Sequence, residues 1–305
     1  VLTQVTQAFI EVLTAQQRLD LLQQMLDLAD QVVKTASARV RAGSVTPLEQ
    51  TRAKVMRASS KIEWIRAQKT LQAARKRLAA TWGSTTPDFK SVQGNLDHIS
   101  KLPSLDDLIQ RLEQNPDLAR WATEINQRQA IIDMEKSKAI PDITLSLGTN
   151  NYLDGNDFNL NAGISIPIPI FNRNQGNVLA AVRRLGKAED QYRNAEISIS
   201  TELSTVYQKL DAAYAELTAL GKDVIPGAES AFNAASRGYR LGEFSFIDVL
   251  DAQRTLFGVK AQYLQAQSEY HLNVAKIERL IGGPLNPLSE PIPAPISEPV
   301  SESIQ

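Results

Sequence analysis

The sequence predicts a mainly α-helical protein with a small β part, in which long antiparallel coiled-coil hairpins make up most of the 305 residues. Apolar residues recur at alternating steps of three and four over long stretches, which is the heptad pattern of packed helices. One short stretch changes to a period of two, which is typical of a β-hairpin. A pattern of glycines and helix starts also occurs twice at a fixed distance, which indicates an internal repeat.

The amino-acid composition argues against several classes of function. The chain has 33 Lys and Arg against 34 Asp and Glu, a formal net charge of -1, so no basic excess favours nucleic-acid binding. The absence of cysteine excludes disulfides, thiolate metal sites and cysteine nucleophiles. The two histidines, His98 and His271, belong to no motif of paired metal ligands. We therefore expect neither an enzyme nor a bound cofactor or metal.

Residues 1–83 predict a first helical hairpin. The chain has neither Gly nor Pro before Gly43, and it resumes with Thr46, a proline and, at the third helical position, Glu49. This order is typical of a capping box that begins a second helix. We expect that helix to end at Gly83. The apolar seam of the first helix comprises Leu19, Leu22, Leu26, Ala29, Val33, Ala36 and Val40.

Residues 142–170 predict a β-hairpin. Apolar and small polar residues alternate in 143–148 and again in 158–166, and a turn-rich loop from Asn150 to Asp157 joins them. From the residues alone two interpretations stay open: a hairpin packed on a soluble core, or a pair of strands of a transmembrane β-barrel. No apolar run approaches 18 residues, so the sequence predicts no transmembrane helix.

Residues 171–283 predict a second and longer helical hairpin. Helical periodicity extends over 174–241, and Pro226 is expected to bend this helix without ending it. Gly242 ends the helix, and Ser245 caps the next one. The two seams comprise Leu203, Val206, Leu210, Ala213, Leu217, Leu220 and Val224, followed by Val249, Ala252, Leu256, Val259, Tyr263, Ala266, Tyr270, Asn273, Ile277 and Leu280.

The segments outside these hairpins are less regular. Within 84–141 we expect a loop with at most one short strand, followed by a helical stretch from Ser104 to about Ala139. Asn115 and the proline after it should break or kink that stretch. Residues 284–305 are rich in Pro, Ser and Glu, which predicts a disordered tail.

The two helical hairpins share one arrangement. At a constant offset of 199 residues, Gly43 matches Gly242 and Glu49 matches Asp248, and the caps match as well. These matches favour duplication over ordinary hairpin geometry. Partners of residues 101–199 would lie before residue 1. We therefore expect the chain to begin within an element and to lack about 100 residues of the first copy, including a β-hairpin.

Two segments carry a resemblance to a known family. Gly238–Gln253 reads GYRLGEFSFIDVLDAQ and Ile166–Asn177 reads IPIPIFNRNQGN. Together they resemble the outer-membrane efflux protein family, the TolC-type channels. The second segment is most similar to the CzcC-type branch, which serves heavy-metal resistance pumps. The resemblance extends over residues 1–283.

The resemblance implies a homotrimer in the Gram-negative outer membrane. Its strands would form a barrel in the lipid, and its paired helices would form a long α-barrel in the periplasm. Such a protein is a passive exit duct, which meets a periplasmic adaptor protein and receives substrate from an energised inner-membrane transporter. The chain departs from the pattern in having one β-hairpin where each family member contributes two, so on its own it is expected not to close the barrel.

The resemblance also implies a gate at the helical tips. Asp251 and Asp248 match acids that form a ring at the periplasmic constriction, where grouped carboxylates favour cations. Tyr239 matches a tyrosine near the closed aperture, with core packing as an equal alternative. Glu49 and Asp248 also have a purely structural explanation, since each could complete a capping box.

Gly43 and Gly242 are the expected adaptor-contact tips, although a tight turn between helices already requires a residue free to adopt positive φ. Phe244 stands where a compared family member has an arginine, so a salt-bridged lock of that kind is not expected. The leading function is a duct for heavy-metal cations. The alternatives are a duct of the same fold for drugs or secreted polypeptides, and a non-conducting coiled-coil scaffold.

Overall fold

A computed structural model of the chain describes residues 2–152 and 157–286. It divides into two compact units, one built from the residues up to Arg111 together with those from Glu202 onward, and the other from Leu112–Thr201. These divisions differ from the boundaries that the sequence suggests, which stay predictions. Most of the expected disordered tail lies outside the described residues. Its first residues are ordered, because Leu285 is buried and its carbonyl accepts a hydrogen bond from Arg111.

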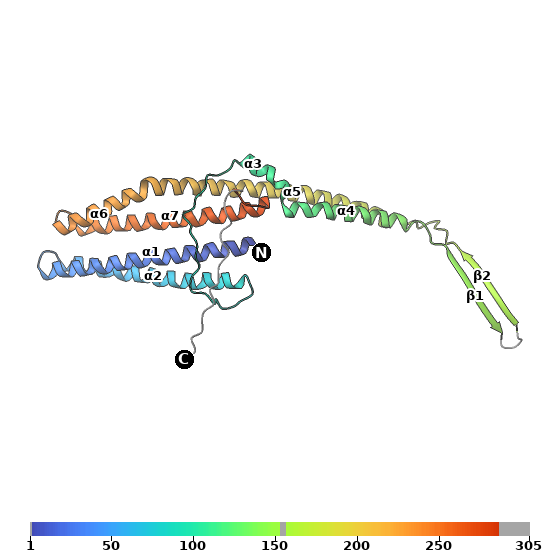
Figure 1. The fold of residues 1–305 in the computed structure, drawn as a ribbon, viewed down its shortest axis with the longest axis horizontal. Helices are drawn as coiled ribbons and strands as arrows, with labels where there is room; N and C mark the ends of the chain where they lie inside the picture. Colours follow the sequence, from blue (N-terminus) through green and yellow to red (C-terminus); the bar gives the residue numbers. More distant parts are fainter. Residues whose placement is uncertain (1, 153–156, 287–305) are drawn as a thin grey trace. The chain divides into compact units, whose positions relative to one another are not determined.

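The first unit contains both helical hairpins. Helices α1 (Leu2–Arg41) and α2 (Pro47–Ala80) form one hairpin, and α6 (Ile225–Leu241) packs on α7 (Phe246–Ile281) in the other. The hairpins meet through α1 and α7, so these helices lie side by side in the order α2, α1, α7, α6 (Figure 1). Ion pairs between Arg77 and Glu11 and between Arg57 and Asp30 connect α2 to α1.

The predicted seams of the second hairpin form its core. Nearly all of their residues are buried, the exceptions being Val224, which is exposed, and Ala252 and Tyr263, which are half-buried. In α1 the predicted seam is less deeply covered, and only its two alanines, Ala29 and Ala36, are fully buried. Small residues at these positions let the backbones of neighbouring helices approach closely. The heptad prediction is therefore confirmed for the second hairpin, whereas in α1 only the two alanines of the predicted seam are buried.

The expected bend at Pro226 coincides with a change of helix type. Helix α5 (Gln175–Ala219) continues into a π-helical turn, η2 (Leu220–Val224), before α6 begins. The N–H of Ile225 donates to the carbonyl of Leu220, five residues back, and Pro226 has no N–H to continue an α-helical ladder. The ring of Tyr263 lies against Gly221, 3.3 Å from where a Cβ would stand.

The segment between α2 and α3 (Leu105–Gln110) contains no strand and crosses both hairpins. The side-chain amide of Gln16 in α1 exchanges two hydrogen bonds with the backbone of Val92, at 2.8 and 3.0 Å. From α7, His271 Nε2 contacts the carbonyl oxygen of Leu96 at 2.9 Å, and the Tyr270 hydroxyl donates to the Ser100 carbonyl at 3.0 Å. This connection therefore joins α1 to α7 near their ends opposite the tips.

His271 makes the stability of this connection dependent on pH. Burial lowers the pKa of His271, and nearby His98 adds to this, while the Leu96 carbonyl and Asp97 oppose it. With a folded pKa below the ordinary value of about 6.5, the unfolded chain binds the proton more tightly. We expect the free energy of unfolding to fall as the pH drops below this value. His271→Gln should flatten the pH dependence between pH 7 and 5 in chemical denaturation, and an unchanged slope would contradict the assignment.

The second unit contains α4 (Pro116–Ser137), a two-stranded sheet and the first part of α5. A short 3₁₀ helix, η1 (Arg111–Gln114), leads into α4. The predicted break is confirmed, because the Asn115 side chain accepts hydrogen bonds from the backbone of Asp117 and Leu118 and so caps a new helix. At the other end Asn174 adopts φ 60° and its side-chain amide donates to Glu135 of α4.

Strands β1 (Thr144–Tyr152) and β2 (Asp157–Ser165) pair antiparallel, with Leu145 opposite Ile164 and Leu147 opposite Ala162. The strands extend further than the sequence indicates, since Asn150 and Asn151 belong to β1 rather than to the loop; the centre of that loop, 153–156, lies outside the described residues. Leu145, Leu147 and Ile164 are 75%, 78% and 72% exposed. The described residues of its own unit therefore leave the apolar face of the hairpin uncovered.

No helix in the described parts of the chain is long and apolar enough to span a membrane.

Candidate gate at the helical tips

Each helical hairpin ends in a tight turn that begins at a glycine. Gly43 and Gly242 have φ values of 70° and 83°, in the left-handed region. The turn after α1 is closed by backbone hydrogen bonds from Gly43 to Val40 and from Ser44 to Arg39. The positive φ expected at both glycines is confirmed, and their contact with an adaptor stays a prediction.

The two predicted capping boxes differ. At the start of α7, Ser245 Oγ accepts a hydrogen bond from the backbone of Asp248, and the Asp248 carboxylate accepts one from the backbone of Ser245 at 2.8 Å. These contacts with Ser245 lower the pKa of Asp248. At the start of α2, Thr46 is the N-cap but its side chain makes no capping hydrogen bond. The capping box predicted for Glu49 is therefore wrong.

Glu49 contacts the other hairpin instead. Its Oε2 lies 3.2 Å from the hydroxyl of Tyr239, which donates a hydrogen bond to it although 190 residues separate the two. Pro47 fixes the first turn of α2, and half-buried Glu49 then faces α6. Burial raises the pKa of Tyr239, as does the charge of Glu49, so the hydroxyl stays protonated and remains a donor at neutral pH. This contact joins the two tips within one chain.

Tyr239 lies in a buried cluster that we call the tip cluster. Only 6% of Tyr239 is exposed, and its ring centroid is 5.6 Å from that of Phe246. The core-packing interpretation of Tyr239 is confirmed, and its hydroxyl also reaches Glu49, while its place at a gate stays a prediction. The tip cluster comprises Ala36, Ala53, Ala235, Tyr239, Phe246 and Val249.

Sequence reasoning missed Arg39. Its guanidinium lies over the Tyr239 ring, 4.4 Å from the centroid, and Nη1 donates to the Tyr239 carbonyl at 2.9 Å. Arg39 thus holds both the ring and the backbone of Tyr239 from α1. A basic residue in the last turn of a helix is common, because it complements the helix dipole, so no sequence signal distinguishes this one.

Two further residues of α7 lie near the tip. Asp251 is exposed and is not brought to Tyr239 or Glu49, so the structure separates it from the contact between the tips. Gln253 is buried, and neither its amide nitrogen nor its amide oxygen has a hydrogen-bond partner within the described chain. Of the predicted gate residues, therefore, Tyr239 and Glu49 meet, Asp248 caps a helix and Asp251 faces outward.

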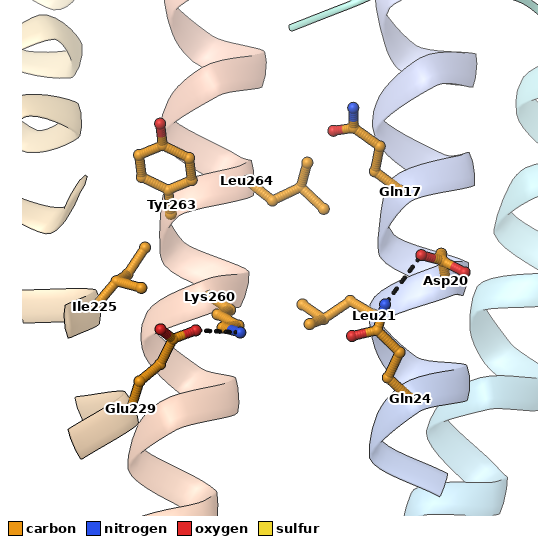
Figure 2. A pocket seen from close by; sticks show the side chains of 9 residues that line it. All are labelled: Gln17, Asp20, Leu21, Gln24, Ile225, Glu229, Lys260, Tyr263 and Leu264. Carbon is orange, nitrogen blue, oxygen red and sulfur yellow. Dashed lines mark hydrogen bonds and ion pairs between the residues drawn. The ribbon is translucent and has the colours of Figure 1, made fainter. Parts of the chain in front are cut away.

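A groove of about 380 Å³ lies further along the hairpins, between α1 and the α6–α7 pair. Figure 2 shows Leu21 of α1 and Leu264 of α7 pointing toward each other across it. Lys260 pairs with Glu229 at 2.7 Å, and Gln24 donates to Asp20 at 3.1 Å, so its charged groups are paired. Among the described residues, those that line the groove included, no group of three or more His, Asp or Glu side chains is arranged to hold a metal ion.

Comparison with known sequences decides the family. The sequence pattern of the family described as "Outer membrane efflux protein" matches residues 1–84 and 108–283. The chain belongs to the outer membrane efflux protein family. The unmatched residues between the two ranges include most of the connection that joins α1 to α7. The family predicted from the two sequence segments is confirmed, and so is the outer-membrane location.

Named relatives make the likeness more specific. This efflux protein is 39% identical to the cobalt-zinc-cadmium resistance protein CzcC of Cupriavidus metallidurans, over 92% of this chain and 67% of CzcC. It is 29% identical to the outer membrane protein TolC of Escherichia coli, over 56% of this chain and 36% of TolC. The chain thus spans about two thirds of CzcC and about a third of TolC. The relatives are named as efflux, resistance and export proteins, which favours transport over catalysis.

Solved structures confirm the fold of this efflux protein. It matches the outer membrane protein VceC of Vibrio cholerae with a TM-score of 0.77 at 21% identity, covering 93% of this chain and 70% of VceC. It matches CusC, described as forming a transmembrane channel, with a TM-score of 0.78 at 21% identity, covering 92% and 68%. The predicted combination of long helical hairpins and a β-hairpin is therefore confirmed as a TolC-like fold.

Proposed function

We propose that this efflux protein is the outer-membrane exit duct of a system that expels heavy-metal cations. The observation that carries the proposal is the 39% identity to a cobalt-zinc-cadmium resistance protein over 92% of the chain. Two relatives are named for pyoverdine export, an organic cargo, but each is only 22% identical. The degree of likeness therefore favours metal cations over organic substrates. We propose transport without catalysis.

We propose that the duct is a homotrimer that works with a periplasmic adaptor and an inner-membrane pump. The apolar face of the β-hairpin would contact membrane lipid, because Leu145, Leu147 and Ile164 are each more than 70% exposed among the described residues. A second uncovered apolar row runs along α2, where Leu48, Val55 and Ile62 recur at intervals of seven and are each more than half exposed. This spacing suits packing against a helix of another copy. The turns at Gly43 and Gly242 would contact the adaptor.

We propose that the contact between Tyr239 and Glu49 holds the tip closed. It joins α6 to α2, and Arg39 supports it from α1, so opening the tip would require the two hairpins to separate. Asp251 would act differently. Its exposed carboxylate, repeated in each copy, would attract cations at the entrance. Asp248 is less suited to that role because Ser245 already holds it.

A complementation experiment tests the proposed cargo. In cells that keep a metal pump and its adaptor but lack their own outer-membrane component, the full-length protein that contains this chain should restore growth in Co²⁺, Zn²⁺ and Cd²⁺. A matched strain that expresses the pump and adaptor alone is the control. Restored tolerance to organic antimicrobials without any gain in metal tolerance would overturn the metal assignment. Failure to restore either, with the protein present in the outer membrane, would overturn the duct itself.

A further inference from the structure

The ring of Phe244 occupies the space beside Gly238. A Cβ atom at Gly238 would lie 2.2, 2.8 and 2.9 Å from Cδ2, Cε2 and Cγ of Phe244, which is closer than real Cβ contacts. Gly238 is buried in the last turn of α6, and Phe244 lies in the turn that follows, with 49% of its surface exposed. The ring therefore covers the helix backbone itself rather than a neighbouring side chain.

The backbone of the same turn folds onto the same residue. The N–H groups of Glu243 and Phe244 both donate to the carbonyl of Gly238, at 2.9 and 3.3 Å. The residue after Gly238 is Tyr239, whose hydroxyl reaches Glu49. The last turn of α6 is thus contacted by the ring and backbone of Phe244 at Gly238 and by Arg39 at Tyr239.

The first hairpin has no such arrangement. At the repeat offset of 199 residues, Arg39 and Val45 stand at the positions of Gly238 and Phe244. Arg39 uses its side chain to hold Tyr239, as described above. The aromatic ring over a glycine is therefore a property of the second tip alone, and it belongs to the hairpin that carries Tyr239.

We propose that Phe244 is a positioning residue for the contact between Tyr239 and Glu49. By packing on Gly238, its ring fixes the last turn of α6 and so places the Tyr239 hydroxyl within reach of the carboxylate. The ring is uncharged, so salt does not screen its contact with Gly238. The inference rests on the proposed gate, because it gives Phe244 a role in closing the tip.

Substitutions at both partners test the packing. Hydrogen exchange of the amides in 235–241 should become roughly tenfold faster in Phe244→Ala, because the last turn opens more often. Phe244→Tyr, which keeps a ring, should exchange like the wild type. Leu241→Ala is the matched control, since Leu241 is 74% exposed in the same turn, and it should leave exchange unchanged.

Gly238→Ala gives a second test, in which the outcome depends on whether hydrogen exchange becomes faster or slower. Alanine favours helix over glycine, so by propensity alone the substitution should slow exchange, by roughly fivefold. In the wild-type background we expect faster exchange instead, because the added methyl group displaces the ring. In the Phe244→Ala background the same substitution should slow exchange. Slower exchange in both backgrounds would show that ring and glycine are not coupled and would overturn the inference.

The same variants in planar bilayers separate this inference from the proposed gate. For the full-length protein that contains this chain, purified from outer membranes, Phe244→Ala and Gly238→Ala should each raise single-channel conductance. The ratio of variant to wild-type conductance should be the same at 0.1 and 1 M salt. An effect on exchange that disappears at high salt would overturn the apolar packing role. Faster exchange with unchanged conductance would leave Phe244 as the positioning residue and overturn the proposed gate. Unchanged exchange in Phe244→Ala would overturn the inference whatever the conductance.

Discussion

Tyr239→Ala is expected to lower the free energy of unfolding by about 3–5 kcal/mol, because it removes a buried aromatic ring from the tip cluster. The ring packs on Phe246 and under the guanidinium of Arg39, and its hydroxyl donates to Glu49. The same substitution should leave the tip open, so conductance in planar bilayers should rise severalfold. Chemical denaturation followed by helical circular dichroism measures the first effect, and single-channel recording the second.

Tyr239→Phe separates the two effects. It keeps the ring and removes only the hydrogen bond to Glu49, so the stability loss should be about 1–3 kcal/mol while the conductance still rises. Glu49→Gln should reproduce the smaller loss. Asp251→Asn is the control for charge alone, and we expect it to reduce cation preference without opening the tip. If the conductance of the Tyr239→Phe variant equals that of the wild type, the hydrogen bond does not hold the gate closed.

Leu147→Arg is expected to disrupt membrane insertion. Leu147 lies opposite Ala162 on the apolar face of the hairpin, and 78% of it is exposed. If that face contacts lipid, an arginine near the bilayer midplane costs about 2–4 kcal/mol in each copy of the proposed trimer. The measurement is the amount of protein that stays in the outer-membrane fraction after urea extraction.

Asn161→Arg is the matched control for this substitution. Asn161 pairs with Gly148 on the opposite face of the same hairpin, where a charged side chain would not enter lipid. The lipid-facing assignment is supported if the Asn161→Arg variant stays in the outer-membrane fraction and the Leu147→Arg variant is lost from it. Equal insertion of both variants would show that the Leu145–Leu147 face is covered by protein.

The heptad seams could be predicted because burial follows helical spacing. Leu203, Leu210 and Ile277 are recognised from their neighbours a turn away, and all three are fully buried. The start of α7 could be predicted for the same reason, since Ser245 and Asp248 interact within one turn. Local patterns therefore determined the helices, the β-hairpin and one of the two capping boxes.

The candidate gate could be predicted only in part. Glu49 has the spacing of a capping acid, yet its partner is Tyr239, 190 residues away, and no local pattern encodes that contact. Resemblance to the family brought both residues to attention but did not pair them. Arg39 gave no signal, because its role depends on how α1 lies against α6. Contacts between the two hairpins depend on tertiary packing, which the hydrophobic periodicity of each helix does not predict.

The π-helical turn at Leu220–Val224 has no equivalent in the first copy of the repeat. At the offset of 199 residues, Gly221 and Pro226 correspond to Leu22 and Asp27, which lie in the unbroken helix α1. Helix α1 is continuous over this stretch. The matching stretch of the second hairpin instead contains a turn in which the backbone hydrogen bonding changes from the α-helical to the π-helical pattern. We therefore expect the two matched stretches to differ in stiffness, so that a bending force on both would act first at the π-helical turn.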